Sequence, residues 1–519
     1  MPKPRLLYLG LDACDSPTVL GWMRDGLLPS LAAIRSRSLA FPTKAPYGTF
    51  VGSTWPSFAT GRRPEHHDHW NWIQVDLDHT DRYVSPRQQT GDAFWRHLDR
   101  AGLRVAVADV PHSLAPASFD GSFVSEWGGH DRLEGTQWTP TDLLTRMGVG
   151  PHPVGCRPAP DDSLRFAPCD PHHRSGLVRD ATETAALVHD LLVGIERKQT
   201  MIEFLIDGGH DVVISVFGES HCVGHQLWHV HDGDHDRHDP AVLASLPDDP
   251  LLMVYRRLDA AVGALVDRVG PGTTVLVHLS HGMQAHHDGT HLLDPLLWRI
   301  EQIDACATPG RISQALDRVP IELRGPALPI AYRWAGRKPE STAPDTPHER
   351  AARRFYQLHN NTVVGAVRVN QQGREQPGVV AVADRPELLD HLEQRLASVI
   401  NLASGEPVVE RCVRGDDIHE RRPDDLLPDL YVEWNRRTQI ERVWSPELGV
   451  VRVPYRHWRT GDHHDDGTLF VAGPDVEPGD DAEPIDLIDV PVSICARFGV
   501  DLPDADGVAM AWAEGVDDA

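Results

Sequence analysis

The sequence predicts an α/β protein with a doubly wound, mostly parallel sheet flanked by helices and a smaller α+β insertion. Two observations carry this prediction. Short, continuously apolar runs alternate with segments of helical length, and such runs are typical of strands buried on both faces of a parallel sheet. Glycine turns such as "DGGH" and "GPG" separate helical segments from the strands that follow them. Repeated helix–strand units place helices on both faces of one sheet.

The elements are expected in a regular order along the chain. The first strand is Arg5–Asp12 ("RLLYLGLD"), and Ser16 followed by Pro17 supplies a cap and a first-turn proline for a helix. Three helix–strand pairs follow: 91–101 with 104–110, 181–206 with 211–217, and 251–269 with 273–279. A strand over 468–473 and a short helix within "IDVPVSICARFGV" complete the core.

The length of 519 residues allows more than one domain. We expect a single core built from residues 1–305 and 426–519. The segment 306–425 is rich in Pro and Arg and has shorter alternating runs, so we expect an insertion that covers the site edge of the sheet. Two segments, 135–182 and 232–250, are expected to be loops, and the sequence indicates no function for them.

Composition narrows the class of partner. A net charge of −26 argues against nucleic acid or an anionic membrane as the main partner, because both require clustered Lys and Arg. No apolar stretch approaches 18 residues, so neither a signal peptide nor a membrane span is expected. Seven scattered Cys without a CxxC pair predict a reduced, cytoplasmic chain. The oligomeric state is not indicated.

The 30 His residues form clusters beside strand-like runs, and imidazole is the commonest metal ligand. Asp12 ends the first predicted strand, while Glu219 to His225 and the pair Ser280-His281 follow two others. In doubly wound sheets, ligands bind beyond the carboxyl ends of the strands. These polar residues should therefore gather at one edge of the sheet.

His221 and His225 are four residues apart, so one helical turn would place both on the same face. This is the spacing of paired metal ligands, although two histidines on a solvated helix would show the same spacing. The later stretch "GDHHDDG" could supply a third imidazole. Asp12 could be a hard ligand for a second cation.

The stretch "GSTWPSFATGRRPEHH" places two hydroxyls, Ser53 and Thr54, ahead of a helix-like run. Thr54 is expected at the start of that helix, where a hydroxyl can accept the unpaired backbone N–H groups of the first turn. Capping is one interpretation of Thr54, and a nucleophile is another.

The order of these motifs resembles the alkaline phosphatase superfamily, in its type I phosphodiesterase/nucleotide pyrophosphatase branch. The family pattern "T-x-P-S/N…TG…P…HG" is matched by "TWPS", "TG" and Pro64 to His67, and "D-x-x-G-H" by "HCVGH". "S-D-H-G-M" is matched by "LSHGM", and a late "H-x-x-x-G" by His463 and Gly467. Weaker likenesses such as "LPDLYVEW" extend the resemblance over nearly the whole chain.

The resemblance implies a two-metal esterase with Thr54 as nucleophile and a phosphothreonine intermediate. Two divalent ions are implied, zinc first and iron or manganese as alternatives. The implied ligands are Asp12, Thr54, His221, His225, Ser280, His281 and His463. A cation would lower the pKa of a threonine hydroxyl, and a helix N-terminus at Thr54 would favour a phosphate there. Ser53 matches no catalytic position and is expected to be structural.

The chain departs from the family pattern at two carboxylates: His221 and Ser280 stand where the family has Asp. Less anionic sites should bind a second dication more weakly and prefer zinc or iron. Glu219 could restore a carboxylate if the segment is extended, and His464 is a further ligand candidate beside His463. Four other histidines are expected in outer or surface positions: His278, His286, His287 and His291.

The function expected from the resemblance is hydrolysis of phosphodiester or pyrophosphate bonds in a small phosphate ester or nucleotide-like substrate. A phosphomonoesterase, a phosphonate hydrolase and a phosphotransferase are alternatives on the same site. A sulfatase is disfavoured because Thr54 cannot become a formylglycine. A further alternative belongs to a different class of protein. It is a degenerate binding protein, in which the loss of the two Asp residues has abolished the dinuclear metal centre.

Overall fold

The computed structural model describes residues 2–128, 134–148, 180–307, 346–455, 459–480 and 483–513. The chain forms two compact units: the first comprises 1–69, 85–286 and 457–519, and the second comprises 70–84 and 287–456. The second unit thus has wider bounds than the insertion expected at 306–425 and includes a segment from the N-terminal part. Residues 308–345 of that insertion and 149–179 of the loop 135–182 lie outside the described residues.

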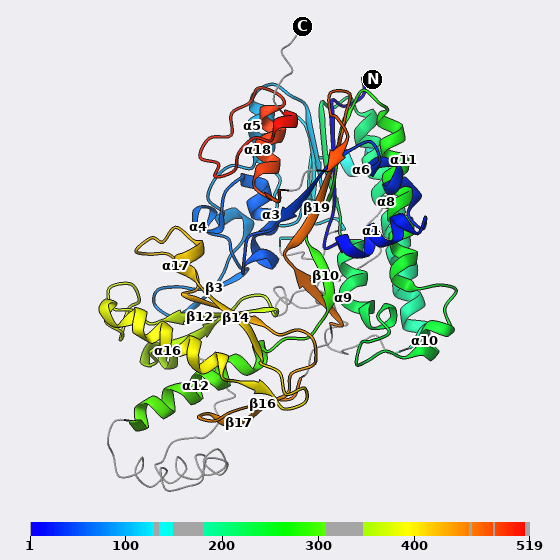
Figure 1. Ribbon diagram of the computed structural model, residues 1–519. Coiled ribbons are helices and arrows are strands. Elements are labelled where there is room, and N and C mark those ends of the chain that lie inside the picture. Colours follow the sequence, from blue (N-terminus) through cyan, green and yellow to red (C-terminus); the bar gives the residue numbers. More distant parts are fainter. Residues whose placement is uncertain are drawn as a thin grey trace. The chain divides into compact units, whose positions relative to one another are not determined.

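The first unit is built on a ten-stranded, mostly parallel sheet, which confirms the predicted fold class (Figure 1). Its order is β20-β2-β19-β9-β1-β8-β5-β6-β7, with β21 beside β2. The central strands are β1 (Leu6–Leu11), β8 (Val212–Phe217) and β9 (Thr274–Leu279), and all their residues are buried. The remaining strands are β2 (Leu39–Lys44), β5 (Val105–Ala108), β6 (Ser122–Ser125), β7 (Gln137–Thr139), β19 (Asp466–Ala472), β20 (Gly479–Asp480) and β21 (Ile485–Asp486).

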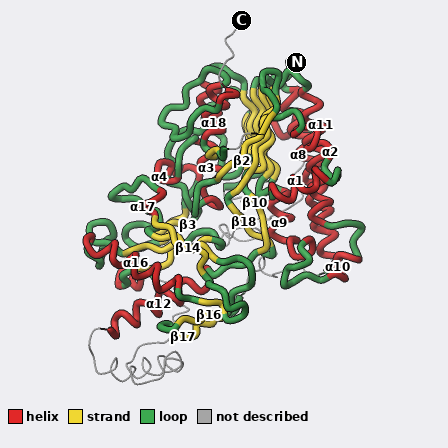
Figure 2. The backbone as a smooth tube through the Cα atoms, viewed as in Figure 1, coloured by secondary structure: helices red, strands yellow, loops and turns green. Residues whose placement is uncertain are grey.

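Helices cover both faces of this sheet (Figure 2). One apolar core joins it to α1 (Ser16–Arg24), α2 (Pro29–Arg35), α8 (Ala181–Asp207), α9 (Glu219–His231) and α11 (Pro250–Val269). A second core on the other face joins it to α3 (Phe50–Thr60), α5 (Phe94–Arg100) and α18 (Asp489–Ala496). Short helices α4 (Pro64–His67), α6 (Leu143–Met147) and α10 (Pro240–Ala244) lie in connecting segments. None of the helices in the described ranges has the length and apolar character that a membrane span requires.

The predicted elements of the core are present, with ends shifted by a few residues. One local prediction was wrong: the cap of α1 is Asp15 rather than Ser16. The Asp15 side chain accepts the backbone N–H of Thr18, and Ser16 is already the first residue of the helix. A carboxylate competes well for this position because it accepts the unpaired N–H groups of the first turn.

The second unit is α+β in character and has its own apolar core. Its main sheet is antiparallel, in the order β11 (Phe355–Leu358), β12 (Val364–Val369), β15 (Leu430–Trp434) and β14 (Val409–Arg414). A smaller sheet joins β13 (Ile400–Asn401), β16 (Arg442–Ser445) and β17 (Gly449–Arg452), and β3 (Ile73–Val75) pairs with β4 (Asp81–Tyr83). In its described residues the helices are α12 (Thr290–Ala307), α15 (Pro347–Ala352), α16 (Arg385–Ala397) and α17 (Gly415–Ile418).

The topology of the first unit brings several chain segments to one edge of the sheet. Strands β1, β8 and β9 run parallel, so their carboxyl ends lie at the same edge. Strand β19 is antiparallel to both β9 and β2, so β2 also ends at that edge. Just beyond β9, the short strand β10 (Gly282–Ala285) pairs with β18 (Gly461–His464) and sets Met283 opposite His463. This ladder carries a distant part of the chain to the edge where β1 and β8 end.

Candidate metal centre

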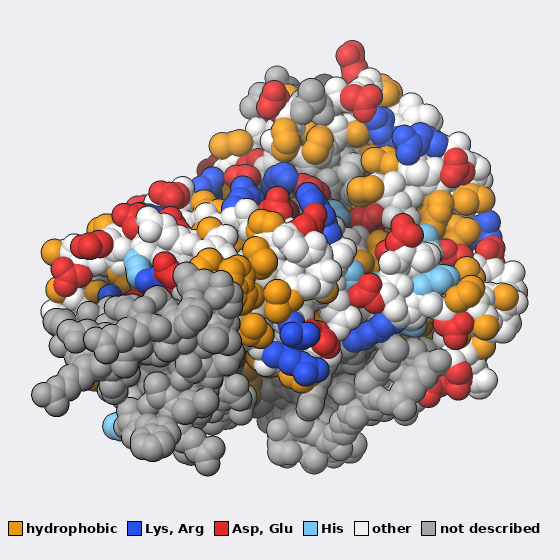
Figure 3. All heavy atoms as spheres, turned by 60° about the horizontal axis from the view of Figure 1, so that its bottom comes forward, with side chains coloured by type: hydrophobic (Ala, Val, Ile, Leu, Met, Phe, Trp, Pro, Cys, Tyr) orange, Lys and Arg blue, Asp and Glu red, His pale blue; other side chains and the backbone are white. Residues whose placement is uncertain are grey.

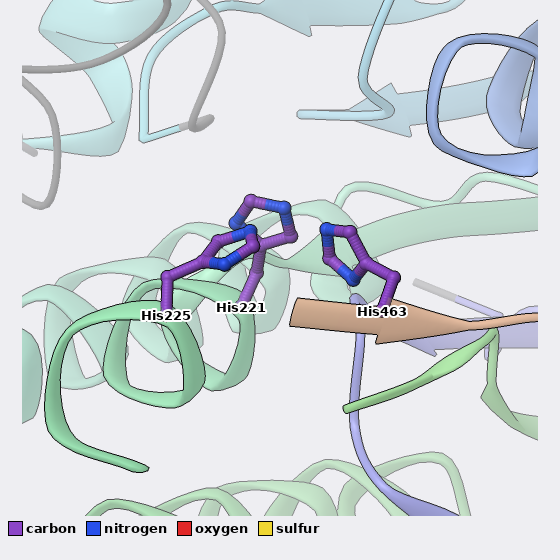
Figure 4. Close-up of side chains that lie close together, drawn as sticks. All are labelled: His221, His225 and His463. Atoms are coloured by element: carbon purple, nitrogen blue, oxygen red, sulfur yellow. The ribbon is translucent and has the colours of Figure 1, made fainter. Parts of the chain in front are cut away.

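Three histidines converge at this edge: His221 and His225 from α9, and His463 from β18 (Figure 4). One ligand nitrogen from each ring lies within 4.8 Å of the other two, and all three residues are buried. No other trio of His, Cys, Asp or Glu converges in this way within the described ranges. The donor chemistry fits a divalent cation, because three imidazoles with an open fourth position are a ligand set of catalytic zinc sites.

The local structure explains why the first two histidines meet. Helix α9 starts directly after β8, and the spacing of four residues places His221 and His225 on one face, as predicted. Their ring centroids are 4.4 Å apart. The Ser220 hydroxyl donates to the backbone oxygen of Asp12 over 2.7 Å, which ties the start of α9 to the end of β1.

The third histidine depends on contacts between α9 and β18. The backbone N–H of Thr460 donates to the carbonyl oxygen of His225 over 2.7 Å. Nδ1 of His225 lies 2.7 Å from the carbonyl oxygen of Gly461, so Nδ1 carries the proton and the lone pair belongs to Nε2. This tautomer suits a metal ligand, and the carbonyl fixes the orientation of the ring. Sequence reasoning missed Ser220, Thr460 and Gly461, because none of them carries ligand chemistry.

The two neighbouring histidines of β18 have different environments. His463 is fully buried, and its ring centroid lies 4.5 Å from that of His225. His464 points elsewhere: its Nε2 lies 2.9 Å from Oδ1 of Asp15, the cap of α1. Burial opposes ionisation of Asp15, but the hydrogen bonds from His464 and Thr18 outweigh it and lower the pKa of this carboxyl. The structure thus brings His463, rather than His464, into the cluster.

Beside the trio lies a second group of predicted site residues, formed by Asp12, Ser280 and His281. Nδ1 of His281 is 3.1 Å from Oγ of Ser280 and 4.0 Å from Oδ1 of Asp12. The His281 ring centroid lies 4.6 Å from that of His463, so the two groups adjoin. Burial, followed by the nearby His463 and His464 rings, holds the pKa of His281 well below its ordinary value and keeps the ring neutral. The group offers one carboxylate and one imidazole, a weaker donor set than the trio.

Asp12 is oriented by an aromatic residue that sequence reasoning did not select. The indole Nε1–H of Trp55, on α3, donates to Oδ1 of Asp12 over 2.9 Å. This bond connects α3 to the end of β1. The only signal in the sequence is that Trp55 follows the candidate nucleophile directly.

The prediction that a helix begins at Thr54 was wrong. Helix α3 begins at Phe50, with Thr49 in the capping position, and Thr54 lies in the second turn. The Thr54 hydroxyl donates to the backbone oxygen of Phe50, so it does not cap the helix. The misplacement has a physical reason, because Pro56 is typical of a first turn but here lies inside the helix.

The remaining candidates do not join the cluster. Glu219 is buried and is the first residue of α9. Because the segment from Glu219 to His221 is helical rather than extended, two residues at this spacing do not share a face. His278 lies between the Tyr8 hydroxyl at 2.8 Å and the Thr43 hydroxyl at 3.2 Å, and burial lowers its pKa to about 3. His286 pairs with Asp462 in the first unit. His287 and His291 belong to the second unit.

Comparisons with known proteins concern the family and the fold of this chain. The family model "type I phosphodiesterase / nucleotide pyrophosphatase" matches residues 6–466. Phosphonoacetate hydrolase from Sinorhizobium meliloti 1021 is similar in structure, with a TM-score of 0.50, 13% identity and 94% coverage of each chain. Murine ectonucleotide pyrophosphatase/phosphodiesterase 5 has a TM-score of 0.48, 11% identity and 97% coverage of each chain. No curated protein sequence matches the chain.

At these identities the structural likeness concerns the fold alone. The family match is different in kind, since it spans most of the chain, from the first residue of β1 to the first residue of β19. It thus includes every histidine of the candidate centre. The predicted resemblance is confirmed: this chain belongs to the type I phosphodiesterase/nucleotide pyrophosphatase family.

Proposed function

We propose that this protein is a metal-dependent hydrolase of phosphodiester or pyrophosphate bonds in small phosphate esters. The observation that carries the proposal is the buried convergence of His221, His225 and His463 at the sheet edge where this fold class binds ligands. The family is one of phosphoester hydrolases, which supports the reaction class. Figure 3 shows Lys and Arg side chains among Asp and Glu on the face in view, which favours a small substrate over a long polyanion.

The residues of the chain have separate tasks in the proposed reaction. A divalent cation bound by the three histidines would offset charge on the phosphoryl oxygens and on the attacking or leaving oxygen. The Gly461 carbonyl holds the His225 ring in its ligand tautomer. A threonine hydroxyl on α3 attacks phosphorus and forms a phosphothreonine, which water then hydrolyses. The family resemblance implies Thr54 for this role, and Thr49, the capping residue of α3, is a second buried candidate. The N-terminal end of α3 favours the phosphate because its backbone N–H groups carry partial positive charge.

The donor sets support unequal metal binding. The trio offers three nitrogen donors, which favours zinc over iron and manganese for this position. The group at Asp12, Ser280 and His281 would hold a second cation less tightly, because it lacks the second carboxylate of the family pattern. We therefore propose two cation positions, of which the histidine trio retains its metal through purification.

The test combines metal content with a panel of substrates. Elemental analysis of the purified protein is paired with hydrolysis assays on four substrates. These are the diester bis(p-nitrophenyl) phosphate, a dinucleotide pyrophosphate, a monoester and a phosphonate. We expect at least one equivalent of metal, turnover of the diester or the pyrophosphate, and loss of turnover after chelation. Preference for the monoester or the phosphonate would move the assignment to the alternatives. Absence of both metal and turnover would overturn the proposal and favour a binding protein.

A further inference from the structure

We propose that Thr49, rather than Thr54, is the hydroxyl that attacks phosphorus, with Ser53 as its positioning residue. The assignment rests on the proposed function and names the nucleophile of that same site. Thr49 caps α3 and Thr54 lies within it, and both are fully buried, so exposure does not separate them. What separates them is the position of each hydroxyl along the helix and the group that it faces.

The hydroxyl of Thr49 stands at the positive end of α3. Thr49 is the capping residue, and its backbone oxygen accepts the N–H groups of Gly52 and Ser53, each over 3.0 Å. Its side chain makes no capping bond to those N–H groups. The partial positive charge of the first turn stabilises negative charge that develops on an oxygen at this position. It also favours a phosphate at the same place.

The partner of Thr49 can respond to the loss of a proton. Oγ1 of Thr49 lies 2.9 Å from Oγ of Ser53, which itself lies 2.8 Å from the backbone oxygen of Thr49. Ser53 has a single proton, so when it donates to the backbone oxygen, the Thr49 hydroxyl donates to Ser53. When the proton of Thr49 leaves, the Ser53 hydroxyl can turn and donate to the developing alkoxide, which it thereby stabilises.

Thr54 has the opposite environment. Its hydroxyl donates to the backbone oxygen of Phe50, inside the helix. An oxygen that lost this proton would face a carbonyl oxygen, and the repulsion opposes attack. The residue also lies about 7 Å along the helix axis from Thr49, beyond the turn whose N–H groups carry the partial charge. A hydroxyl in this setting is typical of threonines that satisfy their bonding within a helix.

Two contacts tie the chain on either side of Thr49 to segments that carry candidate ligands. The backbone N–H of Ala45, just after β2, donates to the carbonyl oxygen of Asp465 over 3.0 Å, so the segment leading to Thr49 leaves β2 next to the His463–Asp466 stretch. The Trp55 indole reaches Asp12. Side chains of a helix lean toward its N-terminus, so this bond favours a position of Asp12 on the N-terminal side of Trp55, where both threonines lie.

The proposed reaction has two steps, attack by Thr49 and hydrolysis of the phosphothreonine. Oγ1 of Thr49 forms a bond to phosphorus while the bond from phosphorus to the leaving oxygen breaks, and the hydroxyl proton passes to the departing alcohol. Water then attacks phosphorus, the bond to Oγ1 breaks, and a proton from that water returns to Thr49. The sum is a diester plus water giving a monoester and an alcohol.

The test compares three matched variants on the metal-loaded protein: Thr49→Val, Thr54→Val and Thr49→Ser. Valine keeps the shape of threonine and removes only the hydroxyl. We expect Thr49→Val to lower kcat for the diester by about a thousandfold or more, as loss of a nucleophile does. We expect Thr54→Val to stay within about threefold of the wild type and Thr49→Ser to retain measurable turnover. Metal content and the thermal midpoint of each variant identify any that fails to fold.

A second readout does not depend on rates. Acid quench during turnover, trypsin digestion and fragmentation of the peptide 45–62 locate the phosphate, because both threonines lie in that peptide. Phosphate on Thr49 supports the assignment. Phosphate on Thr54, or an active Thr49→Val with an inactive Thr54→Val, overturns it and leaves the hydrolase proposal standing. A wild type that turns over none of the esters overturns the hydrolase proposal itself, and the assignment with it.

Discussion

The two adjacent histidines of β18 have different roles: His463 is a candidate metal ligand, and His464 has a structural contact. His463 faces His225 and His281, while His464 bonds to the cap of α1. We expect His463→Ala to lower zinc affinity more than about 100-fold, because removing a ligand costs more than removing the partner of a ligand. His464→Ala is the matched control and should change stability without changing zinc affinity. Competition with a coloured chelator measures both, and equal losses in the two variants would refute the assignment of His463.

The buried side chain of His67 should make the stability of the protein depend on pH. His67 is fully buried between the Ser57 hydroxyl and the backbone N–H of His69, and burial lowers its pKa to about 3. In the unfolded chain the His67 ring binds a proton near pH 6.5, whereas in the folded chain the ring stays neutral at this pH. Stability is therefore fully present above pH 6.5 and is lost as the pH falls toward 3, by about 2 kcal/mol between pH 6.5 and 5.

Urea unfolding at several pH values checks this effect. The wild type should lose stability from pH 6.5 to 5, and His67→Gln should show a shallower dependence because it does not titrate there. Parallel slopes for the two proteins would show that His67 does not contribute. Comparing slopes rather than absolute stabilities cancels the contributions of the other buried histidines.

How far the sequence predicts the site depends on how local each signal is. The pair His221 and His225 could be predicted, since their spacing and the helix that gives it meaning are both local. The start of α3 could not, because Pro56 mimics a first-turn signal inside the helix. The contact of His225 with Gly461 joins residues 236 positions apart, and no local pattern encodes it.

At the scale of elements, the metal centre depends on a close approach between α9 and β18. A Cβ on Gly461 would come within 2.3 Å of the backbone oxygen of Gly224, which cannot move aside as a side chain would. We expect Gly461→Ala to push β18 away from α9, so that His463 separates from the two histidines of the helix. Zinc affinity should fall by about 10- to 100-fold although all three ligands remain.

Gly233→Ala is the control for this prediction, because a Cβ there meets nothing within 4 Å. It should leave zinc affinity unchanged. A Gly461→Ala protein that binds zinc as the wild type does would show that the approach of these two elements does not govern the centre. The ladder between β10 and β18 could not be expected from the sequence, because "GDHH" lacks the apolar alternation of a strand.

The whole molecule comprises two compact units with separate cores, and each should respond to its own perturbation. Zinc at about 100 times its dissociation constant should stabilise the first unit by about 2.7 kcal/mol, because binding favours the folded state. The second unit contains none of the candidate ligands and should not respond. Calorimetry with and without zinc should show one shifted transition and one unshifted. A shift of both would show that the units unfold together.

The second unit offers the complementary perturbation. Asp429 is fully buried and accepts from Arg374 at 2.6 Å, Arg385 at 2.9 Å and Arg421 at 3.0 Å. Burial opposes its ionisation, but the arginines, Arg374 first, outweigh it and hold the pKa of this carboxyl well below its ordinary value. Asp429→Asn removes the charge that the three arginines share, although each keeps another carboxylate partner: Glu375, Asp416 and Asp425 in turn. The change should destabilise this unit by about 3 kcal/mol, the low end for a broken buried ion pair. Zinc affinity should not change, and a loss of zinc binding would contradict the independence of the units.

Fold class was predictable at this scale, because continuous apolar runs such as Leu6–Leu11 mark strands of a parallel sheet wherever they occur. Unit boundaries were harder, because the second unit takes up residues 70–84, far from the rest of it in the chain. The contacts that recruit this segment join distant residues, such as Gln376 to Leu77 and Arg350 to Asp81. The periodicity of apolar residues in a sequence does not predict contacts between such distant residues.

The most direct measurement is the rate of diester hydrolysis as zinc is returned to metal-free protein. We expect no turnover without metal, and activity that appears as the trio of His221, His225 and His463 fills. Any further rise should come only at higher zinc, as the weaker position at Asp12 fills. His225→Ala should stay inactive across the same titration. Full hydrolysis by metal-free protein, or an unchanged titration for His225→Ala, would show that this histidine centre does not carry the reaction.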